Sequence, residues 1–117
     1  MSSPTQRTLA ELRKRGHIAA VCEFWRAIPG HPAGGVRKDL FGFLDLVALV
    51  DGRIVGIQCT SGANTSARER KIRAECWDNA SAWLSCGGRI EVWGWRKLKK
   101  KVGNRTWFPR ITEVVSR

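Results

Sequence analysis

The sequence is poor in several residue types that build common functional sites. It contains no tyrosine, one methionine and two histidines, and its four cysteines form no C-x-x-C pair. Structural zinc usually needs closely spaced pairs of cysteine or histidine ligands, so we expect no zinc site. The cysteines lie in apolar stretches, where a free thiol behaves as a small core residue, and we expect reduced thiols. They are Cys22, Cys59, Cys76 and Cys86.

The sequence also lacks long apolar segments. No run approaches the roughly 20 residues that span a bilayer. Residues 1–15 are polar and basic, without the apolar centre of a signal peptide. We therefore expect a cytoplasmic protein that does not bind membranes. At 117 residues, the chain is long enough for a single domain, residues 1–117, with its own core.

Acidic residues are scarce relative to basic ones. Lysine and arginine number 21 against 10 acids, which gives a net charge of +11. Such a surplus on a small domain attracts polyanions and releases counterions from them. Binding to anionic lipid would favour an amphipathic helix with large apolar residues opposite a basic face, and no exposed segment has that pattern. Nucleic acid is the preferred partner, and an acidic protein surface is the alternative.

Apolar periodicity and turn residues predict a mixed sheet with helices packed against it, in the order α-β-β-β-α-β-β. This order places the chain in the α/β class. The first helix should stop at Gly16, and the second should turn Ile72, Cys76, Ala80 and Trp83 toward the core. The expected elements are a helix at 5–15, a strand at 17–25, a loop at 26–38, strands at 40–50 and 53–60, a helix ending near 84, and strands at 89–95 and about 105–115, with a basic hairpin at 96–104 between the last two.

The hairpin formed by residues 40–50 and 53–60 is the strongest local prediction. Asp51-Gly52 separates two apolar runs, a combination that favours a type I′ turn. A two-residue turn there places Asp45 directly across from Gln58, with Thr60 on the same face.

The polar pair Asp45 and Gln58 is unexpected in strands that are otherwise almost continuously apolar. Such strands belong in a sheet covered on both faces. An acid in that environment is unfavourable unless it is paired, protonated or bound to metal. Two alternatives stay open: Gln58 can simply hydrogen-bond Asp45 in a satisfied buried pair, or a register slipped by one residue would place the two side chains on opposite faces.

This arrangement resembles the PD-(D/E)XK nuclease superfamily. A helix and a strand precede Asp45, a short turn follows its strand, Gln58-Cys59-Thr60 leaves the next strand, and a helix comes directly after. The layout is most similar to the small archaeal Holliday-junction resolvases and related phage and bacterial proteins, over roughly residues 5–95. The resemblance implies a restriction-endonuclease-like fold, a Mg²⁺ or Mn²⁺ ion, hydrolysis of DNA by a metal-bound water, and a homodimer.

The resemblance assigns catalytic positions to three residues. Asp45 matches the first metal-binding acid, Gln58 the second, and Thr60 the lysine that positions or activates water. Glutamine offers a neutral carbonyl oxygen where the family has a carboxylate, and threonine has no charge to lower the pKa of water. Lys71 or Lys38 could supply the missing cation, unless each is a solvated surface residue.

Further acids could complete the site. Glu23, at the end of the first predicted strand, could act as a second acid, and Asp39 is another candidate. The family often adds a glutamate on the first helix, where the nearest matches here are Gln6 and Glu11. Each of these side chains is a solvated surface group under the alternative interpretation.

Basic residues flank the expected site. Those predicted to bind nucleic acid are Arg37, Lys38, Arg68, Arg70, Lys71, Arg96, Lys97, Lys99, Lys100 and Lys101. The last five form a cluster on the expected 96–104 hairpin, where they could contact phosphates or protect an edge strand from aggregation. Most of the six tryptophans should be core residues, whereas Trp25 and Trp107 are candidates for stacking on an unpaired base.

Two hypotheses therefore stand. The preferred one is a PD-(D/E)XK-like nuclease that binds DNA, branched or structured DNA included, and cuts it at a divalent metal held by Asp45 and Gln58. The alternative is the same fold kept as a non-catalytic module that binds nucleic acid or regulates a partner protein.

Overall fold

Apolar residues along the central strands build a mixed five-stranded sheet. The computed structural model describes residues 2–99 and 105–116. The sheet order is β1-β4-β5-β6-β7, in which β5 and β6 run parallel and the other neighbours antiparallel. The predicted mixed α/β class is confirmed. The elements are α1 (Pro4–Lys14), β1 (Ile18–Val21), β2 (Phe24–Ala27), β3 (Gly35–Lys38), β4 (Leu46–Val50), β5 (Arg53–Ser61), a 3₁₀ turn η1 (Gly62–Asn64), α2 (Thr65–Glu75), α3 (Trp77–Ser85), β6 (Arg89–Lys99) and β7 (Arg105–Val114).

Helices cover the sheet on both faces. Leu9 and Leu12 of α1 pack in one core cluster with alternate residues of β4, β5 and β6. Ile72 of α2 and Ala80 of α3 pack in a second cluster on the other face. This two-sided burial explains why the central strands are almost continuously apolar. No helix in the described part of the chain is long and apolar enough to cross a membrane.

The ends of α1 follow from its sequence. The Ser3 hydroxyl accepts a hydrogen bond from the Gln6 N–H at 3.2 Å, and Pro4 occupies the first turn, where its missing N–H is harmless. Gly16 has a φ of +87°, and the His17 N–H donates to the Leu12 carbonyl across it. The predicted stop at Gly16 is confirmed, because this left-handed conformation favours glycine.

The Asp51-Gly52 hairpin is also confirmed. Both residues have positive φ, 50° and 80°, as a type I′ turn requires. The strands pair from Val50↔Arg53 to Leu46↔Ile57, in the predicted register.

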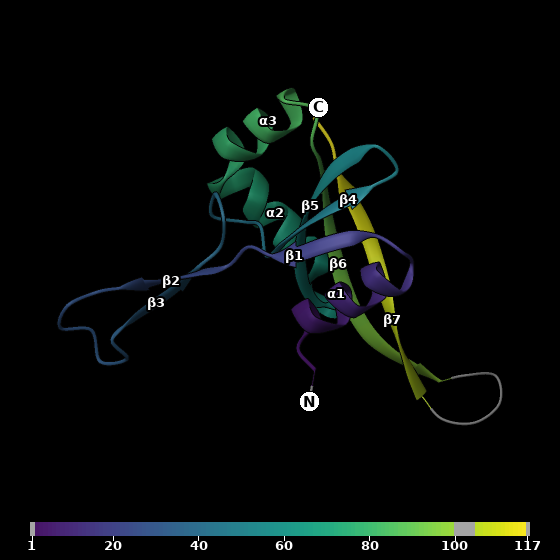
Figure 1. Cartoon of the computed structure of the whole chain (residues 1–117), viewed down its shortest axis with the longest axis horizontal. Helices are drawn as coiled ribbons and strands as arrows, with labels where there is room; N and C mark the ends of the chain where they lie inside the picture. The colour runs from purple at the N-terminus through teal and green to yellow at the C-terminus, as the bar shows by residue number, and fades with distance from the viewer. Residues whose placement is uncertain (1, 100–104, 117) are drawn as a thin grey trace.

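The predicted loop at 26–38 is confirmed only for residues 28–34, because residues 26–27 and 35–38 belong to the two strands of a hairpin. β2 and β3 pair antiparallel and form a separate two-stranded sheet. This arm, residues 24–38, projects away from the five-stranded sheet (Figure 1). The predicted strand at 17–25 is accordingly two strands, with Cys22 and Glu23 between them.

The predicted strand at 40–50 is wrong over its first six residues. Leu40 and Leu44 form an isolated antiparallel bridge around a tight turn, in which Phe41 and Gly42 have φ of 55° and 87°. Regular β4 starts only at Leu46. Gly42 is the sequence feature that indicates this turn, since glycine adopts positive φ without steric strain.

The predicted second helix is two helices that meet at Cys76. Trp77-Asp78-Asn79 starts α3, and aspartate and asparagine favour helix starts over helix interiors. The Asn79 amide also donates to the Phe41 carbonyl at 3.0 Å, which ties this start to the preceding turn. The order is therefore α-β-β-β-β-β-α-α-β-β, with one more helix and two more strands than predicted.

Candidate functional site

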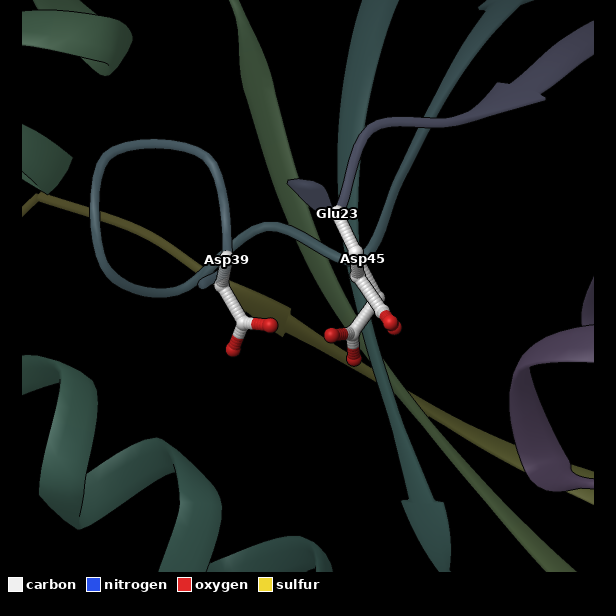
Figure 2. A group of neighbouring side chains, drawn as sticks. All are labelled: Glu23, Asp39 and Asp45. Atoms are coloured by element: carbon white, nitrogen blue, oxygen red, sulfur yellow. The ribbon is translucent and has the colours of Figure 1, made fainter. Parts of the chain in front are cut away.

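Two successive chain reversals bring three carboxylates together. The register of β2 with β3, continued by one residue, places Glu23 opposite Asp39 at the base of the arm. The Leu40–Leu44 bridge then places Asp39 and Asp45 on either side of one tight turn. One carboxylate oxygen from each of Glu23, Asp39 and Asp45 lies within 4.8 Å of the others. Figure 2 shows the three side chains converging from the β1–β2 connection, the end of β3 and the start of β4.

Asp45 interrupts the β4–β5 ladder. Its backbone N–H donates to the Ile57 carbonyl at 2.9 Å, although Ile57 is already the partner of Leu46. Its carboxylate accepts a hydrogen bond from the Cys59 N–H at 2.7 Å. In a regular antiparallel ladder, a backbone carbonyl of the neighbouring strand would accept that bond. Two residues thus oppose one, as in a β-bulge. The predicted face-to-face pair of Asp45 and Gln58 is therefore wrong in detail, because regular pairing stops at Leu46.

Burial controls the protonation of Asp45. The residue is only 7% exposed, and this desolvation raises the pKa of its carboxyl from 3.8 to about 8. The Cys59 N–H opposes the rise, whereas the carboxylates of Asp39 and Glu23 add to it. Because its pKa lies close to neutral pH, the Asp45 carboxyl can either keep its proton or lose it and bind a cation.

Glu23 has polar partners from two other elements. Its carboxylate contacts the Arg37 guanidinium at 3.2 Å and accepts from the Thr5 hydroxyl at 3.5 Å. The Glu23 side chain is 13% exposed and that of Arg37 is 73% exposed. The predicted acid Glu23 therefore lies beside Asp45. Arg37, expected only as a phosphate contact, is a cation in contact with this cluster.

Gln58 is buried on β5, between the two residues whose backbones bond to Asp45. It is 5% exposed, and within the described residues its Oε1 has no hydrogen-bond partner. Gln58 is therefore not the fully satisfied partner that the alternative interpretation required, because its Oε1 accepts no hydrogen bond from any described residue. A buried amide oxygen without a partner is unfavourable, and such an oxygen can accept a proton donor or ligate a cation. Thr60 is also buried, at 5% exposure.

The donor set fits a hard divalent cation. Mg²⁺ prefers oxygen ligands at about 2.1 Å, so the oxygens around it lie about 3–4 Å apart. The carboxylate oxygens of Glu23, Asp39 and Asp45 need only small movements from their 4.8 Å span to reach that spacing. Carboxylate and carbonyl oxygens suit Mg²⁺ or Mn²⁺ better than softer metals.

Four predicted site candidates lie elsewhere or at the surface. Lys38 ends β3 and Lys71 lies on α2, and both residues are exposed. Glu11 pairs with Arg15 at 2.8 Å on α1, and Gln6 is exposed in the first turn of that helix. None of these four contacts the acids through a hydrogen bond or ion pair among the described residues.

The basic residues predicted to bind nucleic acid fall into three groups. Arg37 and Lys38 lead directly into Asp39, and Arg68, Arg70 and Lys71 lie on α2. Arg70 helps to line an open hollow of about 510 Å³ together with Arg73 and Glu69. Arg96 and Lys97 are exposed on β6, which pairs with β7 as the predicted hairpin. Lys99 ends β6, and Lys100 and Lys101 lie outside the described residues.

The two predicted stacking tryptophans differ in accessibility. Trp25 on the arm is 57% exposed, and Trp107 on β7 is 40% exposed. The Arg7 guanidinium lies 3.8 Å from the centre of the Trp107 ring, so one face of that ring is covered. Trp93 and Trp95 are buried in the α1-side core, as expected from their shared strand face.

The cysteines offer no activated nucleophile near the acids. Burial raises the pKa of the Cys22 thiol to about 11 and that of Cys59 to about 12, and the Asp45 charge adds to both. Thiolates attack and thiols do not, so both groups are inert near neutral pH. All four cysteines are unbridged in the described chain. Cys59 is buried, and Cys22 and Cys76 are half-buried and pack against the second core cluster, so the expected core packing fails only for the exposed Cys86.

Comparison with known proteins found no match: no family model, no curated protein and no solved structure is similar to this chain. Function is therefore inferred from the residues and their geometry.

Proposed function

We propose that this chain is a divalent-metal-dependent nuclease domain that binds DNA. The observation that carries the proposal is the cluster of Glu23, Asp39 and Asp45, whose carboxylate oxygens approach within 4.8 Å, in a protein of net charge +11. Three acids held this close repel each other, and a bound divalent cation removes that repulsion.

The contrast between local and overall charge supports a phosphodiester substrate. The positive field of the whole domain attracts a polyanion. The carboxylates would repel a phosphate at the cluster itself unless a cation neutralised them. A metal held there thus supplies both attraction for a phosphate and, when bound, Lewis-acid chemistry with a water of lowered pKa.

Each residue then has a defined task. Glu23, Asp39 and Asp45 would hold the ion, and the unpartnered Oε1 of Gln58, next to Cys59 on β5, is a candidate for a neutral fourth ligand. The Cys59 N–H fixes the Asp45 carboxylate at 2.7 Å. Arg37, beside Glu23, is the cation placed to contact a phosphate at the edge of the cluster.

The resemblance to the PD-(D/E)XK superfamily is part of this proposal. It adds branched DNA as a substrate, a homodimer, and the positions of Asp45, Gln58 and Thr60. The acids proposed here, Glu23 and Asp39, come from a different part of the chain than the second motif of that family. They would replace the carboxylate that Gln58 does not supply.

A second candidate is a non-catalytic nucleic-acid-binding module of the same fold. Gln58 and Thr60 favour it, because both are buried and uncharged at the positions where the resemblance implies an acid and a lysine. A domain that keeps the basic surface and loses the metal would still bind DNA.

Cleavage assays separate the two candidates. Linear, supercoiled and four-way-junction DNA are incubated with the protein in Mg²⁺ or Mn²⁺, beside Asp45→Ala, Asp39→Asn and the exposed control Asp51→Asn. We expect metal-dependent cleavage that only the first two substitutions abolish. Cleavage that survives Asp45→Ala would contradict the assigned site. Salt-sensitive binding without cleavage would favour the non-catalytic module, and no binding at moderate salt would leave an acidic protein partner.

The double substitution Gln58→Glu with Thr60→Lys extends the assay. It restores the residue types that the resemblance implies, and we expect tighter metal binding. Unchanged or weaker binding would count against the resemblance, although the three acids could still hold a metal.

A further inference from the structure

One face of the β2–β3 arm joins the acid cluster to an exposed tryptophan. In an antiparallel pair, every second residue points to the same side. The register pairs Trp25 with Arg37 and, two residues further out, Ala27 with Gly35. Glu23 and Asp39, at the base, continue this face. The 3.2 Å contact between Glu23 and Arg37 is the diagonal neighbour contact that such a shared face predicts.

The Trp25–Arg37 pair is open to solvent. Trp25 is 57% exposed, and the Arg37 side chain is 73% exposed. The arm extends away from the body of the protein (Figure 1), so a long ligand can lie along it. Trp107 is less accessible, because Arg7 covers one face of its ring at 3.8 Å.

We propose that this face of the arm binds an unpaired nucleotide of a single-stranded nucleic acid. Its base stacks on Trp25, its phosphate contacts Arg37, and the chain continues toward the acids. Trp25 lies two residues from Glu23, a distance of about 7 Å along a strand, so the stacked base belongs close to the phosphate at the acid cluster. The inference rests on the proposed function, because it names the substrate form that this site would receive.

Two physical points favour an unpaired strand over other occupants. Stacking needs the flat face of a base, which neighbouring pairs cover in a duplex, and every base offers one, so this contact does not depend on sequence. A second copy of the chain carries the same net charge of +11 and is repelled overall. A phosphate chain complements this charge.

The test compares Trp25→Ala with Phe24→Ala. Phe24 is 50% exposed and lies next along the same strand, on the opposite face of the arm, so it is a matched control. Binding of a labelled single-stranded oligonucleotide and of a duplex of equal length is measured by fluorescence anisotropy in EDTA, where no cleavage occurs. We expect Trp25→Ala to weaken single-strand binding about 5- to 150-fold, the equivalent of one lost stacking contact. Duplex binding should change less than twofold. Phe24→Ala should change neither, and Trp25→Phe should restore part of the loss.

Several results would overturn the inference. Equal losses for Trp25→Ala and Phe24→Ala would remove the assignment to one face, and equal losses on single strand and duplex would remove the preference for unpaired bases. A dimer that Trp25→Ala converts to a monomer in sedimentation would identify the arm as a protein contact. Because binding is measured without metal, a Trp25-specific loss in a protein that never cleaves DNA would support this inference and reject the nuclease proposal.

Discussion

Asp45→Asn tests whether the buried carboxylate opposes folding in the absence of metal. Asparagine has nearly the same shape, and its Oδ1 can still accept the bond that the Cys59 N–H makes at 2.7 Å. The substitution removes the negative charge of a residue that is 7% exposed and lies beside two further carboxylates.

The direction of the effect follows from proton linkage. Asp45 has a pKa of 3.8 in an unperturbed setting and about 8 in the folded protein, chiefly because burial disfavours its charged form. The folded state therefore binds the proton more tightly. The stability from this proton is fully present below 3.8 and is lost as pH rises through about 8.

The loss of stability that Asp45 can cause as pH rises has an upper limit. The change from 3.8 to about 8 corresponds to about 6 kcal/mol, since each tenfold change in proton affinity equals about 1.4 kcal/mol. Relaxation and water entry at the end of a strand reduce the penalty, and we expect the wild type to lose about 3 kcal/mol between pH 4 and pH 8. Asp45→Asn should lack this loss and be the more stable protein at pH 8 in EDTA.

Metal should narrow this difference, and should reverse the ranking only well above a hundred times Kd, where the stabilisation by binding exceeds about 3 kcal/mol. A cation that binds only the folded state adds RT ln(1 + [M]/Kd), or about 1.4 kcal/mol at ten times Kd. The wild-type protein should gain this stability from metal binding, and the Asp45→Asn variant should not. Because Asp45 must lose its proton to ligate, metal affinity should rise with pH up to about 8.

Urea unfolding followed by tryptophan fluorescence, with EDTA or Mg²⁺, measures all of these quantities. Asp51→Asn, at an exposed turn, is the control and should show no such pH-dependent difference from wild type. A parallel loss or gain of stability by wild type and Asp45→Asn across this pH range would refute the proposed proton linkage, and so would a lower stability of the asparagine variant at pH 8 in EDTA.

Three further substitutions test the packing of the fold near the site and the competition of Arg37 for a metal ligand. Gly94→Ala should lower the free energy of unfolding by about 2 kcal/mol in urea titrations, because the added carbon would lie 2.9 Å from the Gly62 Cα; an unchanged midpoint would contradict this. Trp95→Phe removes a buried bond of 2.8 Å to the Thr8 hydroxyl, and thermal unfolding should show a loss of about 1 kcal/mol or more. Arg37→Ala should tighten Mg²⁺ binding about twofold, since the guanidinium competes for a carboxylate 3.2 Å away; calorimetry that shows weaker binding would refute the competition.

Local signals predicted the parts of the fold that depend on local chemistry. Asp51-Gly52 specifies its own turn, so the β4–β5 register followed from the sequence. Gly16 ends α1 for a similar reason. Asp45 is notable in the sequence because a lone acid in an apolar strand needs a compensating partner, and the hairpin register indicates Gln58 as that partner.

The acids that lie beside Asp45 were harder to predict, because their proximity depends on two turns that the sequence signals only weakly. Gly and Pro between residues 28 and 35 favoured a loop, although Phe24 and Trp25 on one side and Val36 on the other are good strand formers. Phe41, which adopts a positive φ of 55°, is an unusual residue for that conformation. Asp39 joins the cluster only when both turns form, so its proximity to Asp45 could not follow from any single motif.

The energetic conflict at the cluster links fold to function. Burial next to Asp39 and Glu23 makes the charged form of Asp45 unfavourable, and an amide such as Asn at that position would avoid the conflict. The only ion pair that reaches the cluster among the described residues comes from Arg37, through Glu23. One exposed guanidinium cannot neutralise three carboxylates. A divalent cation together with Arg37 can, because their three positive charges equal the three negative charges of the carboxylates, and the negative charge that would repel a phosphate is then removed. The same acids that weaken the metal-free fold would then allow a phosphate to approach.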